Sequence, residues 1–185
     1  MKKKISWLAF GFMLFTLLYS TNTIAQALSS EDIKAQLVKE WTRSKAYTTD
    51  YLNTMPANKY SFKPVDSIRS FAQQMLHLAQ VNVMLISIAT GQAPLSFANS
   101  DLEHSPTAQN KDSVVYYVMA SYDFCAMAVK GLDVNKWGEK VKLFNLEETR
   151  FAILIKSIEH QAHHRGQTTI YIRLQGIKPP QERLF

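Results

Sequence analysis

Apolar residues recur at the 3.6-residue spacing of a helix in four stretches of the chain, and no stretch shows the convincing alternation of a β-strand. The predicted helices span about 29–53, 66–90, 111–130 and 145–175. A polar connection over residues 91–110 is long enough to cross from one end of a bundle to the other, and residues 132–144 form a second connector. The pattern predicts an all-α protein, a four-helix bundle with a long crossover connection.

Polar residues set the predicted starts of two of these helices. Asp66 or Ser67 can cap the second helix by accepting hydrogen bonds from its free amide groups. The fourth helix is expected to begin near Asn145, which places Glu147 and Glu148 in its first turn. Negative charge is favourable there because the helix N-terminus carries partial positive charge.

The N-terminus has the parts of a secretory signal peptide. Lysines precede an apolar run over residues 5–19, and Ala25 and Ala27 form a small-x-small cleavage site. A retained membrane anchor is the alternative, but a span needs about 20 apolar residues and this run is shorter. We predict that residues 1–27 are a signal peptide, cut after Ala25 or Ala27, and that one exported domain over 28–185 remains, periplasmic or secreted.

Composition narrows the possible functions. Residues 1–27 contain three lysines and no acidic residue, so the formal net charge falls from +6 to +3 when they are removed. This small excess and the predicted export argue against a nucleic-acid-binding protein, and no membrane contact is expected after cleavage. Cys125 is the one cysteine, so no internal disulfide can form, and its apolar surroundings predict a buried, unreactive thiol.

Three of the chain's five histidines cluster in the predicted fourth helix. His160 and His164 are four residues apart, so both imidazoles lie on one face and can reach the same point. His163 is rotated by about 100° from His164 and is expected to face elsewhere, beside Glu159. A pair of His160 and His163 is the alternative, less favoured because His164 shares its face with the polar Gln167.

A third histidine on another helix can complete a metal site. His77 lies midway along the predicted second helix, in a largely apolar run. A buried ring needs a partner, since leaving it unpaired costs about 1–3 kcal/mol, and Gln73, Gln74 or Gln80 can supply a hydrogen bond instead of a metal. Together with the pair on the fourth helix, His77 makes three neutral nitrogen donors, the ligands of a catalytic zinc site with an open fourth position.

Further residues are candidates for the surroundings of this site. Gln167 and Tyr171 follow His164 on the same face, so they can line a pocket or orient the ligands, although core packing also explains Tyr171. Arg165 points away and is expected to pair with an acid or to cap the bundle. Gly166 costs about 1 kcal/mol in mid-helix relative to alanine, which a close helix approach would explain.

The pattern offers no clear general base for hydrolysis. Glu159 is one residue off the ligand face, and Asp123 on the third predicted helix is only a candidate. His104 lies in the polar crossover connection and is expected to be a solvated loop residue. The catalytic residues therefore stay undefined.

Four segments carry a resemblance to a known family. They are HQAHHRGQ at 160–167, SFAQQMLHLA at 70–79, MPANKYSFKPVDSIRSF leading into the second helix, and the terminal YIRLQGIKPP. They are spread over residues 55–180 of the mature chain, which resembles the DinB/YfiT-like family of metal-binding four-helix bundles. The combination of the HHRGQ cluster with the upstream histidine is the more specific part.

The resemblance implies a metal site formed by His77, His160 and His164, the same three residues that the spacing indicates. It also implies the bundle fold, a homodimer formed through helices, and a divalent ion such as zinc or nickel. Some members of this family are thiol-dependent transferases or isomerases that work in the cytoplasm, so the predicted export departs from their pattern.

Two functions are compatible with such a site. The first is an enzyme that hydrolyses or transfers a group on an unidentified small molecule, because a divalent ion lowers the pKa of a bound water or thiol. The second is a non-catalytic bundle in which the ion stabilises the fold or a dimer. A DNA-binding module conflicts with export, and di-iron chemistry is disfavoured because the predicted helices lack the ExxH pairs of that fold.

Overall fold

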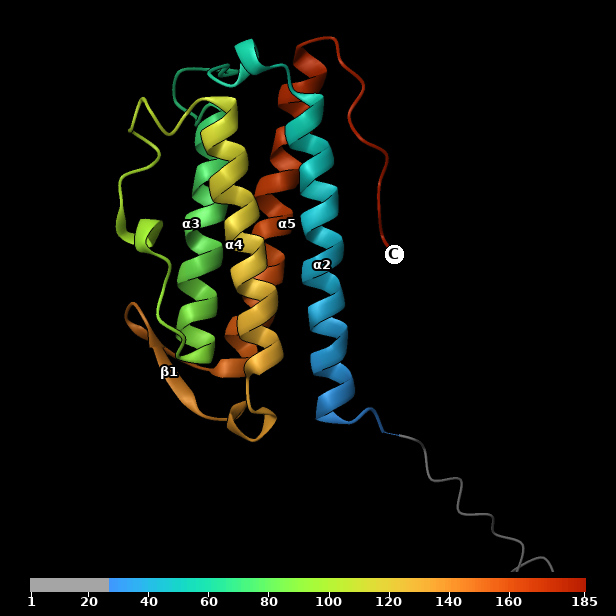
Figure 1. The fold of residues 1–185 in the computed structure, drawn as a ribbon, viewed down its shortest axis with the longest axis vertical. Helices are drawn as coiled ribbons and strands as arrows, with labels where there is room; N and C mark the ends of the chain where they lie inside the picture. The colour runs from blue at the N-terminus through green and yellow to red at the C-terminus, as the bar shows by residue number, and fades with distance from the viewer. Residues whose placement is uncertain (1–26) are drawn as a thin grey trace, which may run out of the picture.

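Four long helices make up most of the computed structural model, which describes residues 27–185. The predicted signal peptide lies outside the described residues except for Ala27. The helices are α2 (Ser30–Thr54), α3 (Phe71–Thr90), α4 (Lys111–Gly131) and α5 (Arg150–Leu174). They pack side by side as an all-α bundle (Figure 1), which confirms the predicted fold class. Within residues 27–185, none of the helices has the length and apolar character that crossing a membrane requires.

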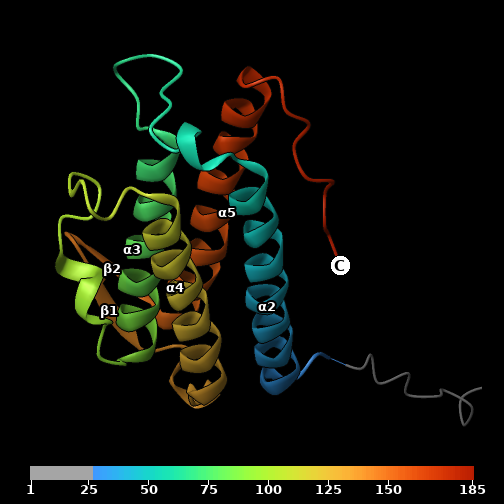
Figure 2. The same cartoon turned by 45° about the horizontal axis from the view of Figure 1, so that its top comes forward.

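The order of the helices in space follows from the crossover connection. Figures 1 and 2 show residues 91–110 running back along the outside of α3, so that α4 starts at the same end of the bundle as α3. Consequently α3 and α4 run in one direction, and α2 and α5 run in the other. Each of α3 and α2 contacts both α4 and α5, so the four helices form a closed ring.

The crossover connection is fixed to α3 along its length. It contains the short 3-10 helix η2 (Ser96–Asn99), whose Phe97 is buried. The side-chain amide of Gln80 on α3 donates to the backbone carbonyls of Phe97 and Ala98 at 3.2 Å and of Ser100 at 2.5 Å. These bonds satisfy backbone acceptors of the loop, which explains how a long polar connection stays against the bundle.

Helix α3 begins later than its sequence pattern predicts. Ser70 is its N-cap and forms a capping box with Gln73, in which each side chain accepts a hydrogen bond from the other residue's amide. Asp66 and Ser67 were the predicted caps, and this prediction is wrong, because both lie in turns before the helix. The first amide of α3 donates to the carbonyl of Phe62 at 3.0 Å, so the preceding segment folds back over the helix start.

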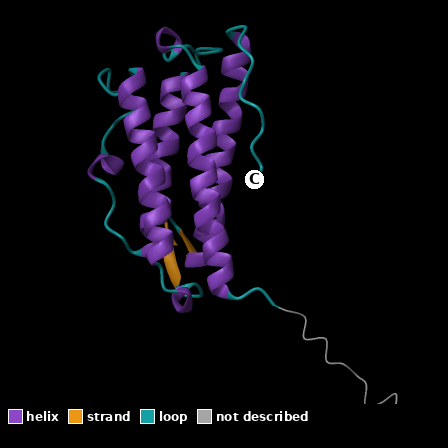
Figure 3. Cartoon of the chain, turned by 45° about the vertical axis from the view of Figure 1, so that its right-hand side comes forward, coloured by secondary structure: helices purple, strands orange, loops and turns teal. Residues whose placement is uncertain are grey.

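A β-hairpin precedes α5, where the sequence pattern indicated no strand. β1 (Lys140–Leu143) pairs antiparallel with β2 (Leu146–Thr149), and Figure 3 shows both strands at one end of the bundle. Phe144, in the turn between them, has a φ of 55°, which is a left-handed conformation. Glycine or asparagine usually occupies such a position, so phenylalanine there does not indicate a turn in the sequence.

The hairpin also moves the start of α5. Thr149 is the N-cap, and its hydroxyl accepts a hydrogen bond from the amide of Ala152 at 3.1 Å. The predicted start at Asn145 is therefore wrong, and Glu147 and Glu148 lie in β2 rather than in the first turn of the helix.

The core lies between the four helices and consists of large apolar side chains. The largest fully buried ones are Trp41, Tyr60, Tyr122, Phe71, Leu52, Met55, Met75, Leu76, Leu78, Ile86, Ile153 and Leu154. Each such burial contributes roughly 1.5–3 kcal/mol to folding. Cys125 is also fully buried, as predicted, and this burial raises the pKa of its thiol well above the ordinary value.

Candidate metal centre

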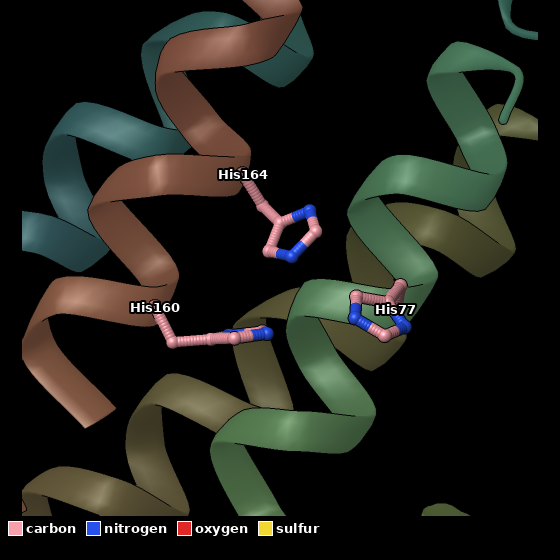
Figure 4. A group of neighbouring side chains, drawn as sticks. All are labelled: His77, His160 and His164. Carbon is pink, nitrogen blue, oxygen red and sulfur yellow. The ribbon is translucent and has the colours of Figure 1, made fainter. Parts of the chain in front are cut away.

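Three histidine rings meet between α3 and α5. Figure 4 shows His77 of α3 facing His160 and His164 of α5. One ring nitrogen from each residue lies within 4.8 Å of the others. The ring centroids of His160 and His164 are 4.4 Å apart, and His77 lies 4.6 Å from His164 and 5.4 Å from His160. We call this group the histidine trio, and its spacing allows one ion to contact all three rings.

A carboxylate from the crossover connection orients His77. Oε1 of Glu103 lies 2.8 Å from Nδ1 of His77, and Oε2 of Glu103 accepts a hydrogen bond from Nε of Arg69 at 2.5 Å. A carboxylate only accepts hydrogen bonds, so Nδ1 of His77 carries a proton, and the tautomer of the neutral ring that fits this contact has its lone pair on Nε2. Carboxylates fix metal-binding histidines in this way in known sites.

The glutamines that the sequence offered as partners for His77 have other roles. Gln73 donates to the backbone carbonyl of Glu103 at 2.9 Å, and Gln80 holds the crossover connection. Glu103 itself was not foreseen, because it is far from His77 in sequence and nothing in its polar surroundings distinguishes it. Only the path of the crossover connection beside α3 brings the two together.

The third of these glutamines, Gln74, orients His164. Its Oε1 accepts a hydrogen bond from Nδ1 of His164 at 2.7 Å, so Nε2 of that ring also keeps its lone pair. The amide group of Gln74 donates to the hydroxyl of Tyr171 at 3.3 Å, and that hydroxyl donates to the carbonyl of Arg69 at 2.8 Å. Tyr171 is 3% exposed. It supports Gln74 and forms no hydrogen bond with a histidine of the trio.

His160 differs from the other two rings. Its Nδ1 is buried and has no hydrogen-bond partner among residues 27–185. A buried polar atom without a partner costs about 1–3 kcal/mol. The hydrogen bonds of the described residues therefore leave one nitrogen of the trio unsatisfied.

Burial keeps two of the rings neutral at physiological pH. It lowers the pKa of His160 to about 4 and that of His164 to about 3, with the charges of neighbouring histidines and Arg69 acting in the same direction. Burial opposes ionisation of Glu103, but hydrogen bonds from Arg69 and His77 outweigh it and lower the pKa of this carboxyl. The site therefore offers neutral nitrogen donors supported by an ionised carboxylate.

A cavity of about 680 Å³ opens beside the trio. Of the three histidines, His164 alone lines it, together with His163 and Gln167 from α5. Gln167 thus lies where the sequence placed it, at a pocket, but its Nε2 lies 2.8 Å from Nε2 of His163, and it forms no hydrogen bond to the trio.

Other candidate residues lie apart from the trio. Glu159 pairs with Lys156 at 2.7 Å instead of with His163, and both charged groups are exposed. Asp123 pairs with Lys45 at 2.5 Å on the surface. Neither carboxylate is placed as a general base beside the trio.

His104 is a solvated loop residue, as expected. Its side chain is 75% exposed and contacts Asp101 at 2.7 Å.

Among the described residues, α5 shows neither an ion pair of Arg165 nor a close helix approach at Gly166. Arg165 is buried but forms no ion pair with any described carboxylate. Its Nη1 donates to Oε1 of Gln161 at 2.5 Å, and its guanidinium lies 4.7 Å from the ring centroid of Tyr47. Gly166 is exposed, and a Cβ added there would meet nothing within 4 Å, so no close helix approach explains this glycine.

The family model described as DinB family matches residues 21–183. No curated protein matches the chain.

Several solved structures share the fold. A DinB-like protein from Bacillus cereus ATCC 10987 has a TM-score of 0.68 at 17% identity, covering 79% of this chain and 95% of its own. A DinB-like protein from Bacillus subtilis has a TM-score of 0.61 at 18% identity, with coverages of 81% and 96%. A conserved protein from Enterococcus faecalis has a TM-score of 0.63 at 18% identity, with coverages of 80% and 98%. At these identities the similarity supports the fold.

Proposed function

The chain belongs to the DinB family, and from this we propose that it binds one divalent ion through His77, His160 and His164. We further propose that it uses this ion, zinc or nickel, to hydrolyse or transfer a group on a small molecule. The observation that carries the proposal is the convergence of three imidazole nitrogens within 4.8 Å beside a cavity. Nitrogen donors of this kind suit both metals.

The residues of the chain fit such an ion in two ways. Glu103 and Gln74 hold the ring protons of His77 and His164 on the Nδ1 atoms, so that the Nε2 atoms are free to bind. His160 has a buried nitrogen that no described residue satisfies. When bound, the ion supplies Lewis acidity and lowers the pKa of a water or thiol ligand toward neutrality.

The metal content of purified protein tests the first part of this proposal. We expect one zinc or nickel ion per chain by elemental mass spectrometry after reloading, and none in a variant with His77→Ala, His160→Ala and His164→Ala. The matched control is His104→Ala with His163→Ala, which removes two other histidines and should retain the ion. Equal metal content in the two variants would refute the site.

Activity tests the second part. Metal-loaded protein is assayed against a panel of small esters, amides and thiol conjugates. Any true turnover should fall at least about a hundredfold in His164→Ala, because loss of a ligand removes the electrophile. Turnover that persists in this variant would show that the trio is not the catalytic centre.

A non-catalytic role is the second candidate, because the trio joins α3 to α5 and an ion there would connect two helices. In this case loss of the ion costs several kcal/mol of stability, whereas a purely catalytic ion leaves the fold nearly intact. Melting curves of wild type and His164→Ala, each with and without metal, separate the two roles. Sedimentation of the loaded protein tests the homodimer that we also propose.

A further inference from the structure

The cavity beside the histidine trio is suited to a hydrophilic ligand. Its volume of about 680 Å³ is that of a small-molecule site. Ile68 is the one apolar side chain in its lining, and the rest of the lining is polar or charged. A largely apolar ligand would gain little binding free energy there, because it would make few hydrophobic contacts and would bury polar groups of the lining without hydrogen bonds.

Arg69 lines this cavity and has one hydrogen-bonding nitrogen that is not used by the described part of the chain. Its Nε and Nη2 both face the carboxylate of Glu103, at 2.5 and 3.4 Å. Its Nη1 has no hydrogen-bond partner among residues 27–185, and the side chain is 40% exposed. A guanidinium group holds a carboxylate well because its N–H groups form a planar fork.

The position of Arg69 is fixed relative to the trio. Through Glu103 it is connected to His77, and its backbone carbonyl accepts the hydroxyl of Tyr171, which lies behind Gln74 and His164. A donor held from both its side chain and its backbone loses little entropy when it binds a ligand.

The charges around the cavity leave a positive excess once an ion is bound. The charge of Glu103 is balanced by Arg69, and the exposed Lys63 and Asp66 balance each other at the rim. Imidazole ligands bring no negative charge to a metal, so the two positive charges of the ion stay uncompensated by the trio. A negatively charged ligand would compensate them.

We infer that the ligand of this site is a small hydrophilic anion whose carboxylate binds Nη1 of Arg69 while a second donor atom reaches the ion held by the trio. The inference rests on the proposed function, because it requires the ion.

Cobalt-loaded protein can test this, since a thiolate bound to cobalt gives a charge-transfer absorption band. The probes are 3-mercaptopropionate and 3-mercaptopropionamide, which share the thiol and the chain length but differ in charge. We expect the carboxylate to bind at least about tenfold more tightly, the effect of one charge-assisted hydrogen bond. In Arg69→Gln this ratio should fall to about threefold or less, while Lys63→Gln, the matched loss of a positive charge at the rim, should keep it.

Each outcome has one meaning. Failure of wild type to bind cobalt refutes the proposed function itself. Cobalt binding with equal affinity for the two probes overturns only the inference, as does a ratio unchanged in Arg69→Gln. If Arg69→Gln releases cobalt, Arg69→Lys takes its place, and the ratio must still fall at least about threefold, because the one ammonium of lysine cannot pair with Glu103 and also present a donor at the position of Nη1.

Discussion

The three rings of the trio differ in the hydrogen bonds of their Nδ1 atoms. His77 has the carboxylate of Glu103, His164 has the amide oxygen of Gln74, and His160 has no partner in the described part of the chain. The three rings are therefore unequal, and each can be perturbed separately. A change at Glu103 acts on His77 without removing a nitrogen donor.

Replacing Glu103 with glutamine should weaken divalent metal binding by about 10–100-fold, the usual effect of losing such a supporting carboxylate. The amide can still accept the hydrogen bond of His77, but it brings no negative charge to the ring. Competition titration with a chromophoric chelator measures the affinity.

The control for this experiment is Asp101→Asn. Asp101 contacts His104 in the same crossover connection at 2.7 Å, but that pair is exposed and separate from the trio. An equal loss of affinity in both variants would show that Glu103 acts only through general electrostatics.

The stability of the metal-free protein should depend on pH through His160 and His164. Their pKa values in the folded protein are about 4 and about 3, below the ordinary 6.5 of the unfolded chain. As the pH decreases, the unfolded chain therefore takes up protons before the folded protein does. The free energy of unfolding thus has its full value above about pH 6.5 and falls as the pH decreases toward the folded pKa values. The expected loss between pH 7 and pH 4 is on the order of a few kcal/mol.

Urea denaturation at a series of pH values measures this dependence. A variant with His160→Gln and His164→Gln should show a flatter profile, whereas His104→Gln should follow wild type because His104 is exposed. A profile that is the same in all three proteins would contradict the assignment.

The sequence predicted which histidines meet, but not what supports them. The i,i+4 spacing of His160 and His164 is a local property of one helix, and His77 stood out as a polar ring in an apolar run. Closeness in sequence makes Gln74 one of three possible partners of His77, yet its side chain reaches across to α5. Glu103 could not be found, because its position depends on the three-dimensional course of a loop.

At the level of secondary structure, helix interiors were easier to predict than helix starts. The starts of α3 and α5 are displaced because Ser70 and Thr149 cap them after segments that fold against the bundle. The S-x-x-Q signature of Ser70 and Gln73 was readable in the sequence. The hairpin before α5 was not, because its strands have four residues each and its turn residue is Phe144.

Two glycines should respond to alanine in opposite ways. Gly166 lies exposed within α5 with open space around its Cα, so Gly166→Ala should raise the free energy of unfolding by about 1 kcal/mol. Gly91 ends α3 with a φ of 76°, so Gly91→Ala should lower it by about 1–2 kcal/mol. Urea denaturation of the two metal-free variants measures both changes in the free energy of unfolding. Destabilisation by Gly166→Ala would contradict the open space around this residue.

At the scale of the whole molecule, the predicted cleavage can be compared with the place where the first helix begins. Ser29 caps α2 through a capping box with Asp32, with both backbone-to-side-chain distances at 3.1 Å. Cleavage after Ala25 or Ala27 would leave this box intact. The predicted cleavage would therefore remove no residue that the first helix uses for its cap.

Mass spectrometry of the exported protein should find an N-terminus at Gln26 or Leu28. A chain that starts at Leu28 should be as stable as one that starts at Gln26, whereas a chain that starts at Ile33 lacks the cap and should lose about 1 kcal/mol. An uncleaved exported chain would exclude the signal peptide, and equal stability of the three chains would exclude a role for the cap.

The crossover connection also has a kinetic consequence. The contact between Gln74 and His164 spans 90 positions of the chain, and the trio forms only when α3 and α5 meet after that long excursion. Contacts between such distant segments form late, because the chain must first lose the entropy of closing the loop. During refolding in the presence of cobalt, the absorbance of the bound ion should therefore appear with the slowest phase and not with the early gain of helix. The bound ion would thus report when α3 and α5 have come together.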